Sequence, residues 1–237
     1  MKLPSITTQG LPANVRLVDF ALVAFDMDST LINIECVDEI ADRAGKRLEV
    51  ARITEAAMQG LIADYKESLR QRVALLRGVH IRELEYVYEH RLQFNPGVER
   101  FVSACREAGL KTLLVSGGFT FFADRVRSRL QLDFARSNEL EVVDGHLSGR
   151  LVPQSWGDIV DGDQKRKTLL EVCHLLGIGA QQCIAVGDGA NDLPMMGAAG
   201  LSIAFHAKPV VAQKAHISIV SGGMDQVLPL LGYAAMS

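Results

Sequence analysis

Short apolar runs alternate with longer amphipathic segments over most of this chain. The first run, residues 20–25, leads straight into Asp26 and Asp28, which are followed by two hydroxyl residues. An apolar run this short is typical of a strand buried on both faces of a sheet. Similar runs predict further strands at residues 111–115, 183–186, 201–205 and 217–220.

Residues 34–94 differ from this rhythm, because they carry no strong strand pattern. They predict consecutive helices at residues 35–44, 48–60, 64–77 and 81–90. Gly45, Gly60 and Gly78 lie near the ends of the first three, where glycine commonly terminates a helix. A turn signal at residues 95–97, Asn-Pro-Gly, closes the segment.

After residue 97 the alternation of helix and strand returns. The pattern predicts helices at residues 98–108, 120–131 and 165–176, short helices at 195–199 and 208–214, and a final helix. Residues 139–143 and 146–152 flank an Asp-Gly pair and predict a hairpin. Residues 1–19 form a polar lead-in, for which an added strand or a helix on the core are both open.

Together these elements predict an α/β fold with a doubly wound, mostly parallel sheet. The helical segment interrupts the sheet after its first strand and should form a cap over the carboxyl edge. We therefore expect two domains, an α/β core of residues 1–33 and 95–237 and a helical cap of residues 34–94.

Composition narrows the possible partners. The 237 residues carry a net charge of −3, with lysine and arginine dispersed, so neither a nucleic-acid nor a membrane surface is expected. The sequence has no run approaching a membrane span of about 20 residues and no signal-peptide pattern near its start. The four cysteines lack metal-ligand spacing and are expected to be free thiols in a reducing cytoplasm. A small-molecule substrate and a monomer or homodimer are expected.

Polar clusters follow three of the predicted strands. They are Asp26 with Asp28, the Ser116-Gly117-Gly118 run, and the segment from Asp188 to Asp192. Each has a simpler interpretation: an Asp/Ser turn, a strand-to-helix turn, or a turn with a helix cap. Lys165 would ordinarily belong to a solvated face. Because the carboxyl ends of parallel strands converge, however, the set could supply carboxylates for a hard cation and a hydroxyl, amides and a lysine for phosphate.

These motifs, in this order, resemble the haloacid dehalogenase superfamily of aspartate-nucleophile phosphatases. Asp26-Met27-Asp28-Ser29-Thr30 matches its DxDxT opening, and residues 187–192, Gly-Asp-Gly-Ala-Asn-Asp, match its GDGxND close. Ser116 and Lys165 match its isolated serine and lysine. From about residue 21 onward, the chain is similar more narrowly to the phosphoserine phosphatase family within that superfamily. The helical insert after the first motif strengthens the resemblance.

The resemblance implies a catalytic scheme. Asp26 would be the nucleophile that forms an aspartyl-phosphate, and Asp28 would act as acid and then base. Mg²⁺ would be held by the carboxylate of Asp26, the backbone carbonyl of Asp28 and Asp188. Ser116, the Gly117 amide and Lys165 would bind the phosphoryl oxygens. Asn191 is placed at the substrate, and Asp192 would position Lys165 or a metal-bound water.

The cap is expected to select the substrate. With ~100° per residue, Arg72 falls within about 20° of Tyr65 on an otherwise apolar helix face. A buried guanidinium needs an anion, which could be an internal glutamate or a substrate carboxylate. The resemblance favours the substrate carboxylate, places Glu35 on the substrate ammonium, and implies that Met58 and Tyr65 line the pocket. Tyr65 departs from the phenylalanine usual in the family.

The resulting hypothesis is hydrolysis of O-phospho-L-serine to L-serine, the last step of serine biosynthesis. Two alternatives keep the same residues: a phosphotransferase that passes the phosphoryl group to homoserine, and a phosphatase for another small phosphomonoester. A non-enzymatic phospho-ligand sensor would not need the nucleophile.

Overall fold

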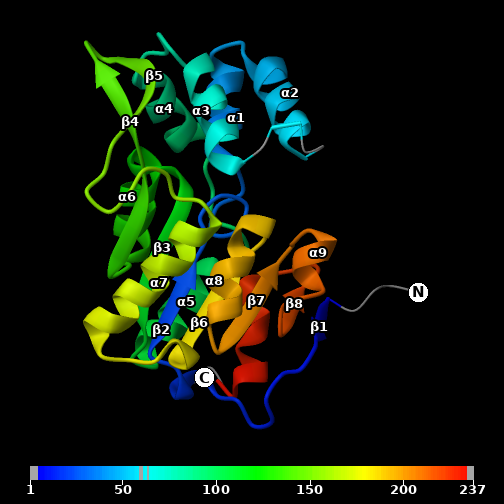
Figure 1. The fold of residues 1–237 in the computed structure, drawn as a ribbon. Coiled ribbons are helices and arrows are strands. Elements are labelled where there is room, and N and C mark those ends of the chain that lie inside the picture. The colour runs from blue at the N-terminus through cyan, green and yellow to red at the C-terminus, as the bar shows by residue number, and fades with distance from the viewer. Residues whose placement is uncertain (1–4, 59–60, 63, 234–237) are drawn as a thin grey trace.

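One mixed sheet organises the chain (Figure 1), which we describe from a computed structural model covering residues 5–58, 61–62 and 64–233. Within these residues the strand order is β1-β8-β7-β6-β2-β3-β4-β5. The strands are β1 (Ile6–Thr8), β2 (Leu22–Phe25), β3 (Lys111–Phe119), β4 (Phe134–Val143), β5 (His146–Val152), β6 (Cys183–Gly187), β7 (Leu201–Phe205) and β8 (Ile217–Ile219). Only β1 against β8 and β5 against β4 pair antiparallel; the other pairs are parallel. The predicted α/β class is confirmed.

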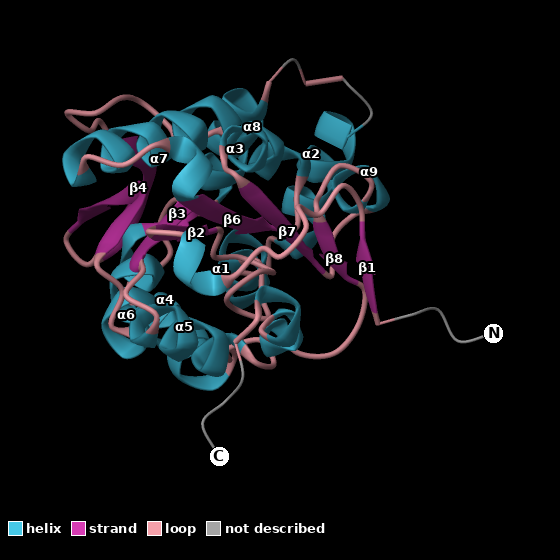
Figure 2. Cartoon of the chain, turned by 90° about the horizontal axis from the view of Figure 1, so that it is seen from below, coloured by secondary structure: helices cyan, strands magenta, loops and turns pink. Residues whose placement is uncertain are grey.

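Helices cover both faces of the sheet (Figure 2). The core helices are α5 (Val98–Glu107), α6 (Thr120–Leu130), α7 (Gly162–Leu176), α8 (Leu193–Ala198) and α9 (Pro209–Ala212). Alternate residues of β2 enter two separate apolar clusters: Val23 and Phe25 pack on the α5–α6 side, and Leu22 and Ala24 on the α7–α8 side. This alternation explains why the first strand is apolar at every position.

The remaining α-helices lie together beyond the carboxyl ends of the parallel strands, at the top of Figure 1. They are α1 (Cys36–Arg43), α2 (Arg47–Met58), α3 (Tyr65–Leu75) and α4 (Arg82–His90). The β4–β5 hairpin reaches the same region. The amide of Gly78 donates to the Leu147 carbonyl at 2.8 Å, and that of Ile81 to the Gly145 carbonyl at 2.9 Å.

Several boundaries differ from the sequence expectation. The strand expected to stop before Ser116 continues to Phe119, with a register irregularity after Val115. β4 begins at Phe134, five positions before the expected hairpin strand, because its first half pairs parallel with β3. α7 begins at Gly162, so that Lys165 lies in its first turn.

Other differences lie at the two ends of the chain. The lead-in supplies the edge strand β1 and a short 3₁₀ helix, η1 (Leu17–Asp19). The expected final helix is instead two 3₁₀ segments, η4 (Met224–Val227) and η5 (Pro229–Leu231). Two more 3₁₀ turns, η2 (Ala180–Gln182) and η3 (Ala190–Asp192), flank β6.

The glycines of the helical segment behave as expected where they are described. Gly45 and Gly78 have φ values of +68° and +82°, the left-handed conformation that ends a helix. Gly60 lies outside the described residues. Across the described chain, no helix combines the length and apolar character needed to span a membrane.

Candidate active site

Strand register brings the three predicted polar clusters to one place. Phe25 lies opposite Leu114 of β3 and opposite Val186 of β6. The residues that follow these positions therefore leave the sheet at its carboxyl edge beside one another, as parallel strands require. The amide of Asp26 donates to the Val186 carbonyl at 3.0 Å, which fixes the start of the first motif against the last.

Lys165 joins two of these clusters through buried ion pairs. Its Nζ lies 2.7 Å from Asp26 Oδ1 and 2.7 Å from Asp192 Oδ1, and the Lys165 side chain is fully buried. Burial alone would lower the pKa of Lys165, but the two carboxylates outweigh it and raise that pKa above its usual value. The lysine is thus a fixed positive charge beside the Asp26 carboxylate.

Asp192 acts as a scaffold for this charge. Besides Lys165, its carboxylate accepts hydrogen bonds from the amides of Asp188, at 3.1 Å, and Gly189, at 3.0 Å. Gly187 has no room for a side chain, because an added Cβ would lie 2.5 Å from the Asp192 carboxyl carbon. The glycine therefore lets Asp192 fold back over its own loop.

Asp28 occupies a different environment two residues after Asp26. It accepts hydrogen bonds from the Cys36 amide, at 3.1 Å, and from the Cys36 thiol, at 3.2 Å. Burial raises the pKa of Asp28 to about 7; the nearby Glu35 charge adds to this, and the Cys36 hydrogen bonds oppose it. A carboxyl group with such a pKa can carry or release a proton near neutral pH.

Three side chains could share a cation. Oxygens of Asp26, Asp188 and Asp192 all lie within 4.8 Å of one another. Lys165 and the Met27 amide both contact Oδ1 of Asp26, and Thr30 donates to Oδ1 of Asp188. Among the described residues, the Oδ2 atoms of the two aspartates have no donor and are available to a cation. Asp28 contributes no carboxylate to this group.

The charge balance of the group also fits a divalent cation. Burial and then Asp192 raise the pKa of Asp26, although Lys165 opposes them. Burial, with Asp192 and Glu35, raises the pKa of Asp188 to about 6. These carboxylates outnumber the one lysine, so a hard dication with oxygen ligands would restore their ionised forms.

The Ser116 loop faces the same carboxylates. Ser116 is fully buried, and its Oγ accepts a hydrogen bond from the Gly118 amide at 2.9 Å, which leaves its own proton available. An added Cβ on Gly117 would lie 2.1 Å from the Tyr65 hydroxyl oxygen. That hydroxyl lies 3.5 Å from the Gly117 carbonyl oxygen, so helix α3 reaches the loop directly.

A cavity of about 860 Å³ connects the core motifs with the cap helices. The predicted residues that line it are Asp26, Asp28, Glu35, Tyr65, Arg72, Ser116, Gly117, Asp188 and Asn191. Lys165 and Asp192 lie buried behind its wall. Met58 is the last residue of α2, and its side chain lies outside what is described.

Two charged side chains from the helical segment, Glu35 and Arg72, line this cavity without an ion-pair partner among the described residues. Glu35 precedes α1, and its Oε1 accepts a hydrogen bond from Ser29 Oγ at 2.6 Å. Arg72 donates from Nε to the Ser68 carbonyl at 3.3 Å. No carboxylate of the described residues pairs with Arg72, which speaks against the internal glutamate that the sequence left open.

Sequence reasoning missed three residues that hold the site together. Thr30 Oγ1 donates to Asp188 Oδ1 at 3.0 Å, and Cys36 binds Asp28 as described. Asn138, only 1 % exposed, donates to the Gly117 carbonyl at 2.8 Å and accepts from the Val160 amide at 2.9 Å. The DxDxT motif could have indicated Thr30, but Asn138 is 21 residues from its partner and had no local signal.

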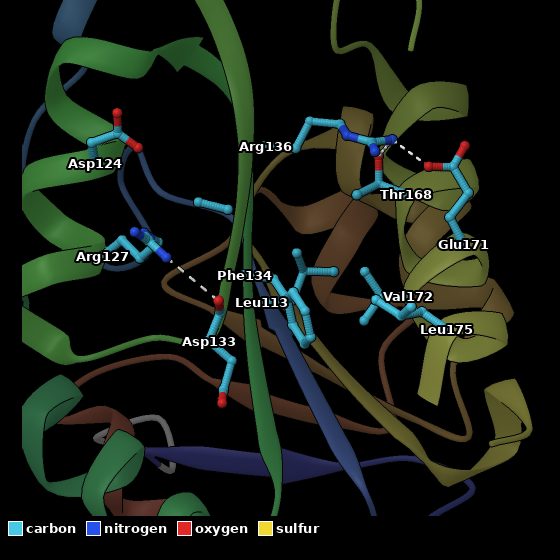
Figure 3. Close-up of a pocket in the computed structure, with 11 residues that line it drawn as sticks. Leu113, Asp124, Arg127, Asp133, Phe134, Arg136, Thr168, Glu171, Val172 and Leu175 are labelled. Atoms are coloured by element: carbon cyan, nitrogen blue, oxygen red, sulfur yellow. Dashed lines mark hydrogen bonds and ion pairs between the residues drawn. The ribbon is translucent and has the colours of Figure 1, made fainter. Parts of the chain in front are cut away.

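A second cavity, of about 500 Å³, lies between α6, β4 and α7 (Figure 3). Arg136 crosses it and pairs with Glu171 at 2.6 Å and with Thr168 Oγ1 at 3.0 Å. None of the predicted site residues lines it. Of its two arginines, Arg136 is neutralised by Glu171 and Arg127 donates to the Asp133 carbonyl, so we assign the cavity no catalytic function.

Comparison with known proteins agrees with this geometry. The sequence model described as haloacid dehalogenase-like hydrolase matches residues 23–197, which include all four motifs. The chain belongs to this family. A phosphoserine phosphatase from Polaromonas sp. (strain JS666 / ATCC BAA-500) is 62 % identical over 233 residues, covering 96 % of this chain and 99 % of the relative. One from Idiomarina loihiensis is 47 % identical, covering 89 % and 93 %.

Solved structures of the family have the same fold. One is described as a phospho-aspartyl intermediate analogue of phosphoserine phosphatase, with a TM-score of 0.81 and 37 % identity. It is matched over 90 % of this chain and 99 % of its own. A substrate-bound phosphoserine phosphatase complex has the same TM-score and identity, over 90 % and 98 %. The predicted resemblance is confirmed.

Proposed function

We propose that this protein is a magnesium-dependent phosphoserine phosphatase that converts O-phospho-L-serine to L-serine and phosphate. The observation that carries the proposal is the pair Asp26 and Asp28. One carboxylate is held by Lys165 with a free oxygen, and the other has a pKa of about 7. The names of the relatives and the family's fold support the same activity.

Asp26 would attack phosphorus with one oxygen of its carboxylate while the bond to the seryl oxygen breaks, giving an aspartyl-phosphate and an alkoxide. Protonated Asp28 would deliver its proton to that alkoxide, releasing serine. The resulting Asp28 carboxylate would then remove a proton from water as the water attacks the phosphoaspartate. The second attack regenerates Asp26 and releases phosphate, so that protons balance over the cycle.

Binding of the phosphoryl group requires positive charge and hydrogen-bond donors. Lys165 supplies the charge, Ser116 the hydroxyl donor, and the Gly117 amide a third contact. Asp26 and Asp188 with the Asp28 carbonyl would hold Mg²⁺, and Asp192 would keep Lys165 in place. When bound, Mg²⁺ neutralises charge on the phosphoryl oxygens and on the carboxylates. Asn191 would contact the substrate from the η3 turn.

We also propose that residues 34–94 work as a lid over a core made of residues 1–33 and 95–237. In this scheme Arg72 binds the substrate carboxylate, Glu35 binds its ammonium, and Tyr65 and Met58 close the apolar side. A lid of this kind excludes water while the aspartyl-phosphate forms. Action in the cytoplasm, and a monomeric or homodimeric state, stay predictions.

The decisive test compares kcat/KM on phosphoserine, phosphothreonine and a sugar phosphate for the wild type and Arg72→Ala. We expect phosphoserine to be preferred, and Arg72→Ala to remove that preference. Mass spectrometry of acid-quenched enzyme should detect phosphorylated wild type and no phosphorylated Asp26→Asn. Full turnover by Asp26→Asn would refute the nucleophile, and phosphohomoserine as the main product with added homoserine would indicate a phosphotransferase.

A further inference from the structure

A second carboxylate of α1, Asp38, faces the substrate cavity beside Glu35. Glu35 precedes the helix and Asp38 is its third residue, so both lie on the first turn. Glu35 has a hydrogen bond from Ser29, whereas Oδ1 of Asp38 is buried and has no donor among the described residues. An unpartnered buried acceptor is costly and rare in folded proteins, so its presence calls for a functional explanation.

Arg72 is a positively charged side chain that lines the same cavity as Asp38. Burial raises the pKa of Asp38, and the Arg72 charge opposes that rise more than any other group. The two side chains nevertheless form no ion pair, because Arg72 turns its Nε to the Ser68 carbonyl of its own helix. The Asp38 carboxylate and the Arg72 guanidinium therefore both line the cavity without being paired to each other.

A ligand carrying both charges on neighbouring atoms could pair with both side chains. An α-amino acid has this pattern: its ammonium offers three N–H donors, and its carboxylate accepts from a guanidinium. Glu35 keeps one oxygen engaged with Ser29 and can satisfy only part of the ammonium. Asp38 is the second carboxylate on the same helical turn that lines the cavity, and its Oδ1 has no donor among the described residues.

We propose that Asp38 is a specificity-determining residue that accepts a hydrogen bond from the substrate α-ammonium alongside Glu35, while Arg72 binds the carboxylate. This inference rests on the proposed phosphoserine phosphatase activity and adds a residue to it. It makes Asp38 a substrate ligand rather than a structural acid, and it explains why the protein tolerates a carboxylate oxygen without a donor there.

Three substrates separate this role from the alternatives. O-Phosphoserine has both charged groups, O-phosphoethanolamine keeps only the ammonium, and 3-phosphooxypropanoate keeps only the carboxylate. We expect Asp38→Asn to lower kcat/KM by about 10- to 100-fold on the two amines, the range of one charge-assisted hydrogen bond. On 3-phosphooxypropanoate the change should stay below about 3-fold. Asp38→Glu, which keeps the charge, should retain part of the preference for amines.

Stability gives an independent readout. Because Asp38→Asn removes the charge of a half-buried carboxylate whose Oδ1 has no donor, its urea midpoint should equal or exceed that of the wild type. Asp42→Asn is the matched control: it makes the same change one turn later on α1, where Asp42 pairs with Arg91 outside the cavity. Its activity on all three substrates should match the wild type.

Each contrary pattern has a distinct meaning. A loss on phosphoserine and 3-phosphooxypropanoate that spares phosphoethanolamine would assign Asp38 to positioning Arg72 and overturn the proposal. An equal loss of kcat/KM on all three substrates, with a lower urea midpoint, would make Asp38 a structural residue. No loss of kcat/KM on any of them would also overturn the proposal. A wild type that does not hydrolyse phosphoserine would refute the proposed function itself, independently of what Asp38→Asn does to the amine preference.

Discussion

Asp28 is the residue whose ionisation should set the pH dependence of the first chemical step. Its pKa is raised by burial from 3.8 to about 7, so its acid form is populated below that pH and lost above it. We expect phosphoryl transfer to Asp26 to slow as pH rises through about 7, because ionised Asp28 cannot protonate the leaving alkoxide. Rapid-quench measurement of phosphoenzyme formation would follow this directly.

The control for this prediction is Asp28→Asn, which should be slower by about 10²–10⁴-fold and should lack the fall above pH 7. Its metal affinity should change little, because the Asp28 carboxylate is not among the three that can share a cation. A wild-type profile that stays flat from pH 6 to about 9 would contradict the assignment of Asp28 as acid.

The contact between Tyr65 and Gly117 gives a second prediction, because the Tyr65 hydroxyl leaves no room for a side chain at position 117. An alanine at position 117 would place its Cβ 2.1 Å from the Tyr65 hydroxyl oxygen, and 3.1 Å from the ring carbon that bears it. We expect Gly117→Ala to lower kcat/KM strongly, and Tyr65→Phe alone by less than about 10-fold, since it removes one long hydrogen bond.

Combining the two substitutions should recover part of the activity lost in Gly117→Ala, because the hydroxyl that clashes is gone. Steady-state kinetics on the wild type, the two single variants and the double variant measures the coupling between the two substitutions. Strict additivity of the two effects would show that Tyr65 does not lie against the Ser116 loop during turnover.

At the scale of elements, Asn138 is the side chain by which β4 supports the Ser116 loop. Asn138→Ala would leave the buried Val160 amide without a partner, and the Gly117 carbonyl with only the long hydrogen bond from the Tyr65 hydroxyl. We expect a loss of about 2–4 kcal/mol in the free energy of unfolding, because one unsatisfied group costs about 1–3 kcal/mol and the lost bond to the Gly117 carbonyl adds about 1 kcal/mol, together with lower kcat. Urea denaturation and kinetics test both effects.

Ser103→Ala is a suitable comparison for Asn138→Ala, because it removes an exposed hydrogen bond to Glu107. It should change stability by less than about 0.5 kcal/mol and leave the kinetics unaltered. If Asn138→Ala lowered stability without changing kcat, the Asn138 bonds would support the fold and not the loop geometry.

Elements also show where sequence reasoning succeeded and where it could not. The parallel strands and the polar motifs that follow them in the sequence could be predicted, because both are local patterns. The extension of β3 to Phe119 could not, because Ser116, Gly117 and Gly118 have weak strand propensity. There the pairing of Phe119 with Asn138, set by tertiary structure, determines the conformation.

The charge at Asp38 escaped prediction for a related reason. An aspartate in the first turn of a helix is ordinarily explained by the helix dipole. Only the three-dimensional structure shows that one of its oxygens is buried without a donor and that Arg72 lies across the same cavity. The partners of such a residue come from another helix, or from the ligand itself.

On the scale of the whole molecule, two of the contacts that join the helical segment to the rest of the chain differ in kind. On the hairpin side, backbone hydrogen bonds join Gly78 and Val79 to Leu147, each at 2.8 Å. On a second side, the N-terminal half of α3 contacts residues 158–161 through an exposed ion pair of Arg70 with Asp158 and a half-exposed one of Lys66 with Asp161. Exposed pairs are weak and screened by salt, so this second side should open more easily.

Opening on that side alone predicts a polarised pattern of hydrogen exchange. Amides of α3 near Tyr65 should gain protection when inorganic phosphate and serine are added, whereas Gly78 and Leu147 should be protected equally with and without them. Raising the salt concentration or replacing Arg70 by alanine should increase exchange near Tyr65 in the free enzyme. Arg77→Ala, which lies outside both ion pairs, is the control. Equal gains of protection on both sides would mean that the helical segment moves as a whole and that the hairpin is not its pivot.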